Sequence, residues 1–215
     1  MPYIWGVDSA QSVSKELYNC VLNNYGKPEY WGRYLSTVPN AAEGLIDEEI
    51  ELLHNSGTKV MPIYNDFREA VGERNGRVVA QNAVYHANRL GFPKGTILYA
   101  NVERFFDVDE AWIRGYVNSL YNTDFRAGIY HDPVEGAFKE QFNLAVNNDQ
   151  NVRFQSILWS AEPEVGVTKR RDAPTFNPTE VSNNANVWGW QYGRDADDCP
   201  IDTNLVNKKM YEAMW

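Results

Sequence analysis

Between residues 3 and 146 the chain alternates short apolar runs of β type with longer segments of helical periodicity. The β-type runs cover residues 3–7, 30–35, 59–64, 96–103 and 126–130. After the first run, Val13, Leu17 and Val21 recur at the spacing of one helix face, and comparable stripes follow the other runs. Strands that alternate with helices pair in parallel through crossover connections. The pattern therefore predicts five consecutive β/α units.

The pattern becomes less regular after residue 153. Strands are predicted at residues 154–160 and 186–192, and a terminal helix at residues 205–214. The stretch between the two strands is rich in Pro, Asn and charge; a further strand around residues 173–176 has weaker support because prolines disfavour it.

Five β/α units and three less regular strands would close an eight-stranded barrel of the TIM type, so the expected fold class is α/β. We expect residues 1–215 to form a single domain, because a chain of this length can bury one sizeable core. The alternative is an open doubly wound sheet, but no glycine-rich phosphate loop follows the first run.

The acidic net charge of the chain indicates which classes of binding partner are disfavoured. A net charge of -9 and a pI near 4.9 disfavour nucleic acid and anionic membranes, which the mean field of the protein would repel. No stretch approaches the ~20 apolar residues of a membrane helix, and no signal-peptide segment precedes the first run. We expect a monomer that binds a neutral or cationic polymer without inserting into a membrane.

The cysteines and histidines suggest neither a cofactor nor a metal site. Cys20 and Cys199 lie far apart in sequence, without metal-type spacing, and we favour two unpaired thiols over a disulfide. The histidines form no ligand motif. We therefore expect no metal and no cofactor.

Acidic and amide side chains recur where the β-type runs end. In a β/α barrel the carboxyl ends of the strands meet at one mouth, where catalytic groups gather. Clustered carboxyls raise one another's pKa, and glycosidic cleavage needs a protonated acid beside the leaving oxygen with a second carboxylate opposite. The candidate catalytic residues are Asp8, Asp66, Asn101, Glu103 and Asp202.

Strand alternation gives the sharpest local prediction. Tyr99, Asn101 and Glu103 fall on one face of their run, with the amide and the carboxyl together at its end. An ion pair between Glu103 and Arg104 in a surface loop is an equally good interpretation of the spacing. Asp8 is also compatible with a helix cap, and Asp66 with a turn.

The chain is rich in aromatic residues, which make up 13% of it. Flat aromatic faces can stack on sugar rings, although core packing and contacts between strands are at least as good an explanation for the aromatics near residue 190. The candidate substrate-binding residues are Tyr64, Tyr130, Trp159, Trp188, Trp190, Gln191 and Tyr192.

Motifs in a fixed order carry a resemblance over nearly the whole chain. They are Gly6-Val7-Asp8, Gly32-Arg33-Tyr34-Leu35, Pro62-Ile63-Tyr64, residues 90–96, Asn101-Val102-Glu103, Gly128-Ile129-Tyr130, Trp190-Gln191-Tyr192 and residues 201–204. In this order they resemble the Chalaropsis-type (family twenty-five) lysozymes, and more closely the bacterial glycoside hydrolase-like TIM-barrel domains related to them.

The resemblance implies a pocket for the N-acetylated sugars of peptidoglycan, with Glu103 as general acid and Asp8, Asp66 and Asp202 among the lining acids. It also implies an extracellular or cell-wall location. In the lysozymes an aspartate two residues before the acid assists the substrate's acetamide, and here that position is Asn101. An amide can hydrogen-bond an acetamide but offers no negative charge to a cationic intermediate.

Three hypotheses for function follow. The first is a lysozyme-like glycosidase that cleaves bacterial cell-wall glycan. The second, suggested by Asn101, is a barrel that binds glycan without turnover. The third is a targeting or scaffold domain of an envelope or phage assembly, and the fold alone does not decide among them.

Overall fold

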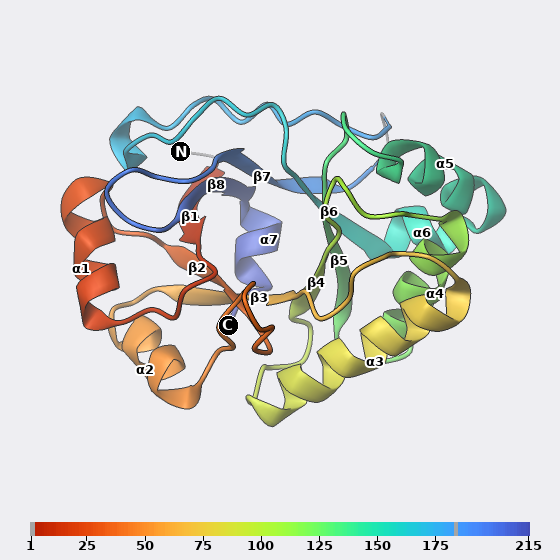
Figure 1. Ribbon diagram of the computed structural model, residues 1–215, viewed down its shortest axis with the longest axis horizontal. Coiled ribbons are helices and arrows are strands. Elements are labelled where there is room, and N and C mark those ends of the chain that lie inside the picture. The colour runs from red at the N-terminus through yellow and green to blue at the C-terminus, as the bar shows by residue number, and fades with distance from the viewer. Residues whose placement is uncertain (1–2, 183–184) are drawn as a thin grey trace.

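The strands of the computed structural model, which describes residues 3–182 and 185–215, pair in chain order and close into one barrel (Figure 1). They are β1 (Tyr3–Asp8), β2 (Tyr30–Tyr34), β3 (Lys59–Tyr64), β4 (Ile97–Asn101), β5 (Arg126–His131), β6 (Ser156–Ser160), β7 (Val187–Gly193) and β8 (Asp202–Asn207). Neighbours from β1 to β7 are parallel, whereas β8 is antiparallel to both β7 and β1. The predicted barrel of five β/α units and three further strands is confirmed.

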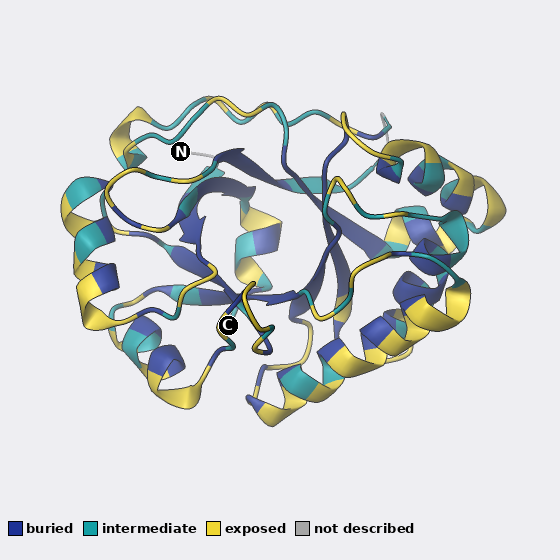
Figure 2. Ribbon diagram, viewed as in Figure 1, coloured by how far each residue is buried: buried dark blue, intermediate teal, exposed yellow. Residues whose placement is uncertain are grey.

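Amphipathic helices cover the barrel and turn one buried face toward it (Figure 2). They are α1 (Lys15–Asn24), α2 (Asp47–Asn55), α3 (Glu73–Arg89), α4 (Glu110–Tyr121), α5 (Phe138–Asn148), α6 (Gln150–Gln155) and α7 (Lys208–Glu212), with a 3-10 turn η1 (Arg170–Asp172). The Ser14 hydroxyl caps α1 by accepting from the Leu17 N–H, and the Asp109 carboxylate caps α4 in the same way through Trp112. Within the described residues, none of these helices is long and apolar enough to span a bilayer.

Two apolar clusters follow from the alternation of side chains along the strands. One fills the barrel and includes Met61, Ile63 and Tyr99, and the other lies between the strands and the helices. Met210 and Met214, on and just beyond α7, join the inner cluster. The C-terminal helix therefore closes the end of the barrel opposite the carboxyl ends of β1 to β7.

The connection from β6 to β7 is largely extended and runs along the upper edge of Figure 1. From β1 to β6, by contrast, a helix lies between each pair of consecutive strands. In the β6–β7 connection the Phe176 ring stacks on Tyr3 with centroids 4.2 Å apart and meets Trp190 edge-on at 6.3 Å. The possible strand at residues 173–176 does not form. This segment covers the outer faces of the strands with side chains instead of joining the sheet.

The C-terminal segment differs from the sequence prediction. Residues 205–207, expected to open a helix, belong to β8, and α7 covers only Lys208–Glu212. Val206, Met210 and Met214 are all buried and follow one another at four-residue intervals, so their spacing imitates one helix face although a strand and a short helix contribute to it.

The prediction of two free thiols is wrong, because Cys20 and Cys199 form a disulfide with their Cα atoms 6.1 Å apart. Cys20 lies on α1, and Cys199 lies in the loop between β7 and β8. Since β8 pairs with β1, that loop returns beside the first β/α unit, and a separation of 179 residues along the chain becomes a contact. Sequence distance gave no sign of this proximity.

Removing the disulfide should lower stability while preserving the fold. A cross-link that closes so long a loop restricts the unfolded chain, and losing one typically costs about 2–5 kcal/mol. We expect the double variant Cys20→Ser/Cys199→Ser to unfold at lower urea concentration than the oxidised protein, by about that free energy. Wild type in reductant should match the variant, and equal midpoints for all three samples would contradict the prediction.

Candidate functional site

Two aspartates face each other where the barrel closes. Asp8 is the last residue of β1 and Asp202 the first of β8, and the antiparallel register pairs them directly. Asp8 is 4% exposed and Asp202 is partly buried. Because β8 runs opposite to its neighbours, its first residue lies at the same barrel end as the last residues of β1 to β7.

Gln191 of β7 joins the two carboxyls. Its Nε2 donates to Asp8 Oδ2 at 3.1 Å and to Asp202 Oδ2 at 3.2 Å. Its Oε1 accepts from the Tyr130 hydroxyl at 2.7 Å, which fixes the amide with its N–H groups toward the acids. A single side chain thereby holds both aspartates in one place.

A second amide, that of Asn204, repeats this arrangement one layer deeper. Its Nδ2 donates to Asp8 Oδ2 at 2.6 Å, and its Oδ1 accepts from Trp159 Nε1 at 3.0 Å. Asp8 therefore keeps two amide donors although it is removed from water. Such satisfied networks hold a buried carboxyl in a single orientation.

Glu103 reaches the same space from the end of β4. Asn101 donates from Nδ2 to Glu103 Oε1 at 2.9 Å, and Tyr99 lies below on the same inward face. Arg104 pairs instead with Glu135 at 3.2 Å. The structure thus places the amide and the carboxyl at the mouth, on the face that strand alternation predicts.

These groups surround a cavity of about 130 Å³. It is lined by Asp8, Tyr34, Asn101, Glu103, Tyr130, Trp159, Gln191, Arg194 and Asp202. Of these, Tyr34 and Arg194 were not among the sequence candidates. Alternation along β2 from the inward-facing Tyr30 points to Tyr34, whereas Arg194 follows β7 in an irregular loop that carries no periodic signal.

Burial changes the protonation of the aspartate pair. Desolvation, opposed by the hydrogen bonds from Asn204 and Gln191 and reinforced by the charge of Glu103, raises the pKa of Asp8 to about 6. Desolvation, reinforced by the charge of Asp8, raises the pKa of Asp202 to about 8. Near neutral pH the pair therefore holds about one proton.

Three sequence candidates lie away from the cavity. Asp66 is exposed in the loop after β3, and Tyr64 points outward, with its ring 6.0 Å from His86 of α3. Trp188 lies at the far end of the barrel, where its ring is 5.2 Å from the Arg126 guanidinium. None of the three lines the cavity.

Trp190 and Tyr192 also point away from it. Both are buried on the outer face of β7, where Trp190 Nε1 donates to the Pro163 carbonyl and the Tyr192 hydroxyl accepts from Trp5. Gln191, between them in sequence, points inward. The pleat of the strand separates these neighbours, so the two rings pack under the β6–β7 connection.

A buried ion pair braces the first two loops of the mouth. Arg33 is fully buried and pairs with Glu49 of α2, while its remaining N–H groups donate to the carbonyls of Ser9 and Glu43. Glu49 also accepts from the Val13 N–H. The loop after β1, which follows Asp8 directly, is thereby tied to the loop after β2.

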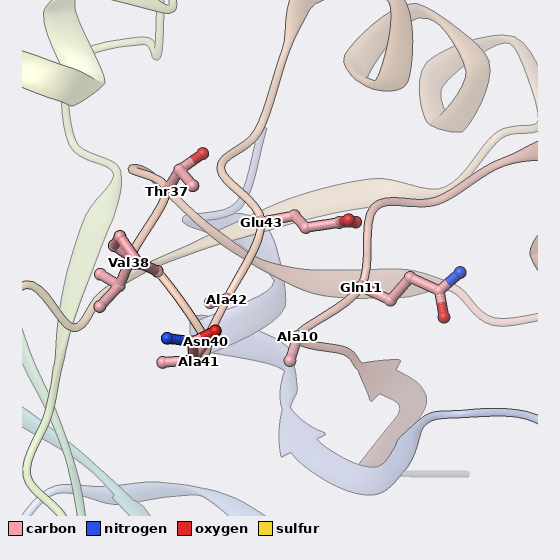
Figure 3. A pocket seen from close by; sticks show the side chains of 9 residues that line it. Ala10, Gln11, Thr37, Val38, Asn40, Ala41, Ala42 and Glu43 are labelled. Carbon is pink, nitrogen blue, oxygen red and sulfur yellow. The ribbon is translucent and has the colours of Figure 1, made fainter.

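Those two loops also enclose a broader hollow of about 450 Å³ at the same barrel end (Figure 3). Its wall combines the small or apolar side chains of Ala10, Val38 and Ala41 with the polar groups of Gln11 and Asn40. The hollow begins two residues after Asp8 and three residues after Tyr34, both of which line the carboxylate cavity.

Within residues 3–182 and 185–215, no group of three or more histidine, cysteine, aspartate or glutamate side chains is arranged to hold a metal ion.

Comparison with known proteins identifies the family. Residues 27–188 match the family described as Rv2525c-like, glycoside hydrolase-like domain. The chain belongs to this family. No curated protein matches the chain.

Solved structures share the fold of this chain. An uncharacterized B. stearothermophilus protein shares 51% identity and superposes with a TM-score of 0.97, covering 99% of this chain and 100% of that one. The Clostridium perfringens spore cortex lytic enzyme SleM has 13% identity and a TM-score of 0.65, with coverage of 99% and 69%. A bacterial lysozyme from Streptomyces coelicolor has 15% identity and a TM-score of 0.58, with coverage of 98% and 96%. The last two likenesses establish a shared fold.

The aspartate pair makes a prediction about pH and stability. Above pH 3.8, the ordinary pKa of aspartate, the unfolded chain releases protons that the folded pair still holds. The contribution of the pair to the free energy of unfolding is therefore largest below that pH. Stability from the pair is then lost as pH rises through the folded-state values of about 6 and about 8. Asp202→Asn removes one of the two groups and should flatten this decline, as measured by urea unfolding at a series of pH values.

The exposed Asp124, paired with Lys94 on the surface, supplies the matched control. Asp124→Asn should leave the pH profile of wild type unchanged. A profile of Asp202→Asn that parallels wild type across the whole window would show that the pair is not desolvated.

Proposed function

We propose that this glycoside hydrolase-like domain cleaves bacterial cell-wall glycan, with Glu103 as the general acid. The observation that carries the proposal is the convergence of Glu103, Asp8 and Asp202 in one small cavity at the strand ends. Glycosidic cleavage needs a proton donor and a second carboxyl group across the scissile bond. The names of the structural neighbours, a spore cortex lytic enzyme and a lysozyme, suggest peptidoglycan as the substrate class.

Each side chain has a defined task in this proposal. Glu103, oriented by the Asn101 amide, protonates the leaving oxygen of the glycosidic bond. Asp8 and Asp202 retain about one proton near neutral pH, so the pair presents about one negative charge to the cationic sugar that develops. Gln191 and Asn204 keep that charge in place.

Asn101 favours a second candidate, a barrel that binds glycan without cleaving it. Its amide donates to the same Glu103 carboxyl that the first proposal uses as acid, and it adds no charge. A neutral amide supplies hydrogen bonds for an acetamide and less stabilisation of a cation than a carboxylate would. Binding without turnover is the outcome that would select this candidate.

The disulfide supports an extracellular or wall-associated location. Disulfides persist in oxidising compartments and are rare in reducing ones, and Cys20–Cys199 joins two distant parts of the chain. The substrate proposed here lies outside the cell membrane as well. We therefore propose that the protein acts at the cell wall.

Purified cell walls test the activity directly. Wild type should release soluble fragments with new reducing ends, detected by mass spectrometry, and Glu103→Gln should lower the rate by at least about 100-fold, as expected for loss of a general acid. The amide is nearly isosteric, so retention of walls in a pull-down should persist.

Two variants outside the cavity complete the design. Glu51→Gln alters an exposed acid of α2 and controls for loss of surface charge, and Asp66→Asn should likewise retain activity because that side chain is exposed away from the cavity. Full activity in Glu103→Gln would remove Glu103 from the role. Saturable binding by wild type with no fragments after long incubation would select the binding module.

A further inference from the structure

The carboxylate cavity is too small to hold a length of glycan. Its volume of about 130 Å³ is below the roughly 300 Å³ at the lower end of ordinary ligand pockets. A polymer that places one bond beside Glu103 must therefore continue across the rim of the mouth. The residues that form this rim become candidates for contacting the neighbouring sugars.

The rim beside Glu103 exposes two large apolar side chains. Phe105, two residues after Glu103 in the loop following β4, is 76% exposed. Val134, in the loop following β5, is 66% exposed. We call these two residues the apolar rim. Both loops lie at the barrel end that carries the cavity, because β4 and β5 are parallel neighbours.

The two loops are fixed against each other. Arg104, next to Phe105, pairs with Glu135, next to Val134, at 3.2 Å. Gly136 has a φ of 77°, and a Cβ at that position would collide with the Arg104 carbonyl. The apolar rim is therefore carried by a closely fitted junction of two loops.

Each loop is also ordered internally. Asp132 Oδ1 accepts from the Val134 N–H at 2.7 Å and from the Glu135 N–H at 2.8 Å, which forms a tight turn. The Phe106 N–H donates to the Glu103 carbonyl at 3.0 Å, so Phe105 is part of the turn that begins at Glu103. An aromatic ring kept at the surface by such a framework is available to a ligand.

We propose that Phe105, supported by Val134, is the platform on which the first pyranose ring outside the scissile disaccharide stacks. The inference rests on the proposed function and assigns the class of ligand at this position: a β-linked N-acetylhexosamine chain, whose axial C–H groups form an apolar ring face. Covering Phe105 with such a face removes apolar surface from water without requiring the loops to move.

Isolated exposed apolar side chains are common and need no ligand. Phe154 is such a residue on this chain, 63% exposed on α6, which precedes β6 at the opposite end of the barrel. The two phenylalanines thus match in type and exposure and differ in distance from Glu103. Phe154 provides the control for the platform.

Affinity for glycans of two lengths tests the proposal. In a Glu103→Gln background, which prevents turnover, calorimetry would use a disaccharide and a tetrasaccharide prepared from peptidoglycan. Phe105→Ala should weaken binding of the tetrasaccharide by about 3- to 10-fold, the range for one aromatic contact, and change disaccharide binding less. Phe105→Trp should keep or strengthen tetrasaccharide binding, and Phe154→Ala should have no effect.

The outcomes separate this inference from the proposed function. Tetrasaccharide binding that is unchanged by Phe105→Ala, or equally weakened by Phe154→Ala, overturns the platform while leaving glycan binding intact. A tetrasaccharide that fails to bind even the parent protein, and walls that wild type neither binds nor cleaves, overturn the proposed function and the platform with it.

Discussion

The antiparallel pairing of β8 with β1 is the constraint on which the rest of the mouth depends. A parallel eighth strand would present its last residue at this end, whereas the antiparallel strand presents its first, Asp202, directly opposite Asp8. β7 pairs with the other edge of β8 and brings Gln191 within hydrogen-bond distance of both acids. Two carboxyls, which would repel each other if both were charged, are thereby held in one cavity with a shared donor. Their raised pKa values follow from burial and from this proximity.

The same closure explains features far from the cavity. Because β8 returns to β1, the loop that precedes it runs beside α1, where Cys199 reaches Cys20. Arg194 and Asp195 lie in that loop, and the Asp195 N–H donates to Asp202 Oδ1 at 2.8 Å. The disulfide therefore holds in place a loop that contributes directly to the cavity. The loop between β7 and β8 therefore contributes both to the stability of the fold and to the geometry of the cavity.

Sequence periodicity predicts the fold correctly where each strand or helix can be recognised from its own residues. The first five units were predicted because each apolar run has its helix beside it, and alternation on β4 put Asn101 and Glu103 on the inward face. The same alternation separates Gln191 from its aromatic neighbours, but only the closed barrel shows which face of β7 is inside.

Features that depend on distant contacts were not predictable in this way. The disulfide and the position of Arg194 arise from where the chain returns in space, which no local pattern encodes. The predicted helix at residues 205–214 overlaps β8 at residues 205–207, because Val206, Met210 and Met214 lie buried at four-residue intervals that fit one helix face. The tertiary contact with β1 decided the conformation of β8, as often happens for short apolar segments.

The central claim is that side chains from the ends of separate strands form one cavity that receives a sugar beside Glu103. A crystal structure of the Glu103→Gln protein with a peptidoglycan-derived tetrasaccharide tests it most directly. The expected result is density for a sugar ring in contact with Asn101, Asp8 and Asp202, with residue 103 at the glycosidic oxygen. A glycan bound elsewhere on the surface, with this cavity unoccupied by sugar, would contradict it.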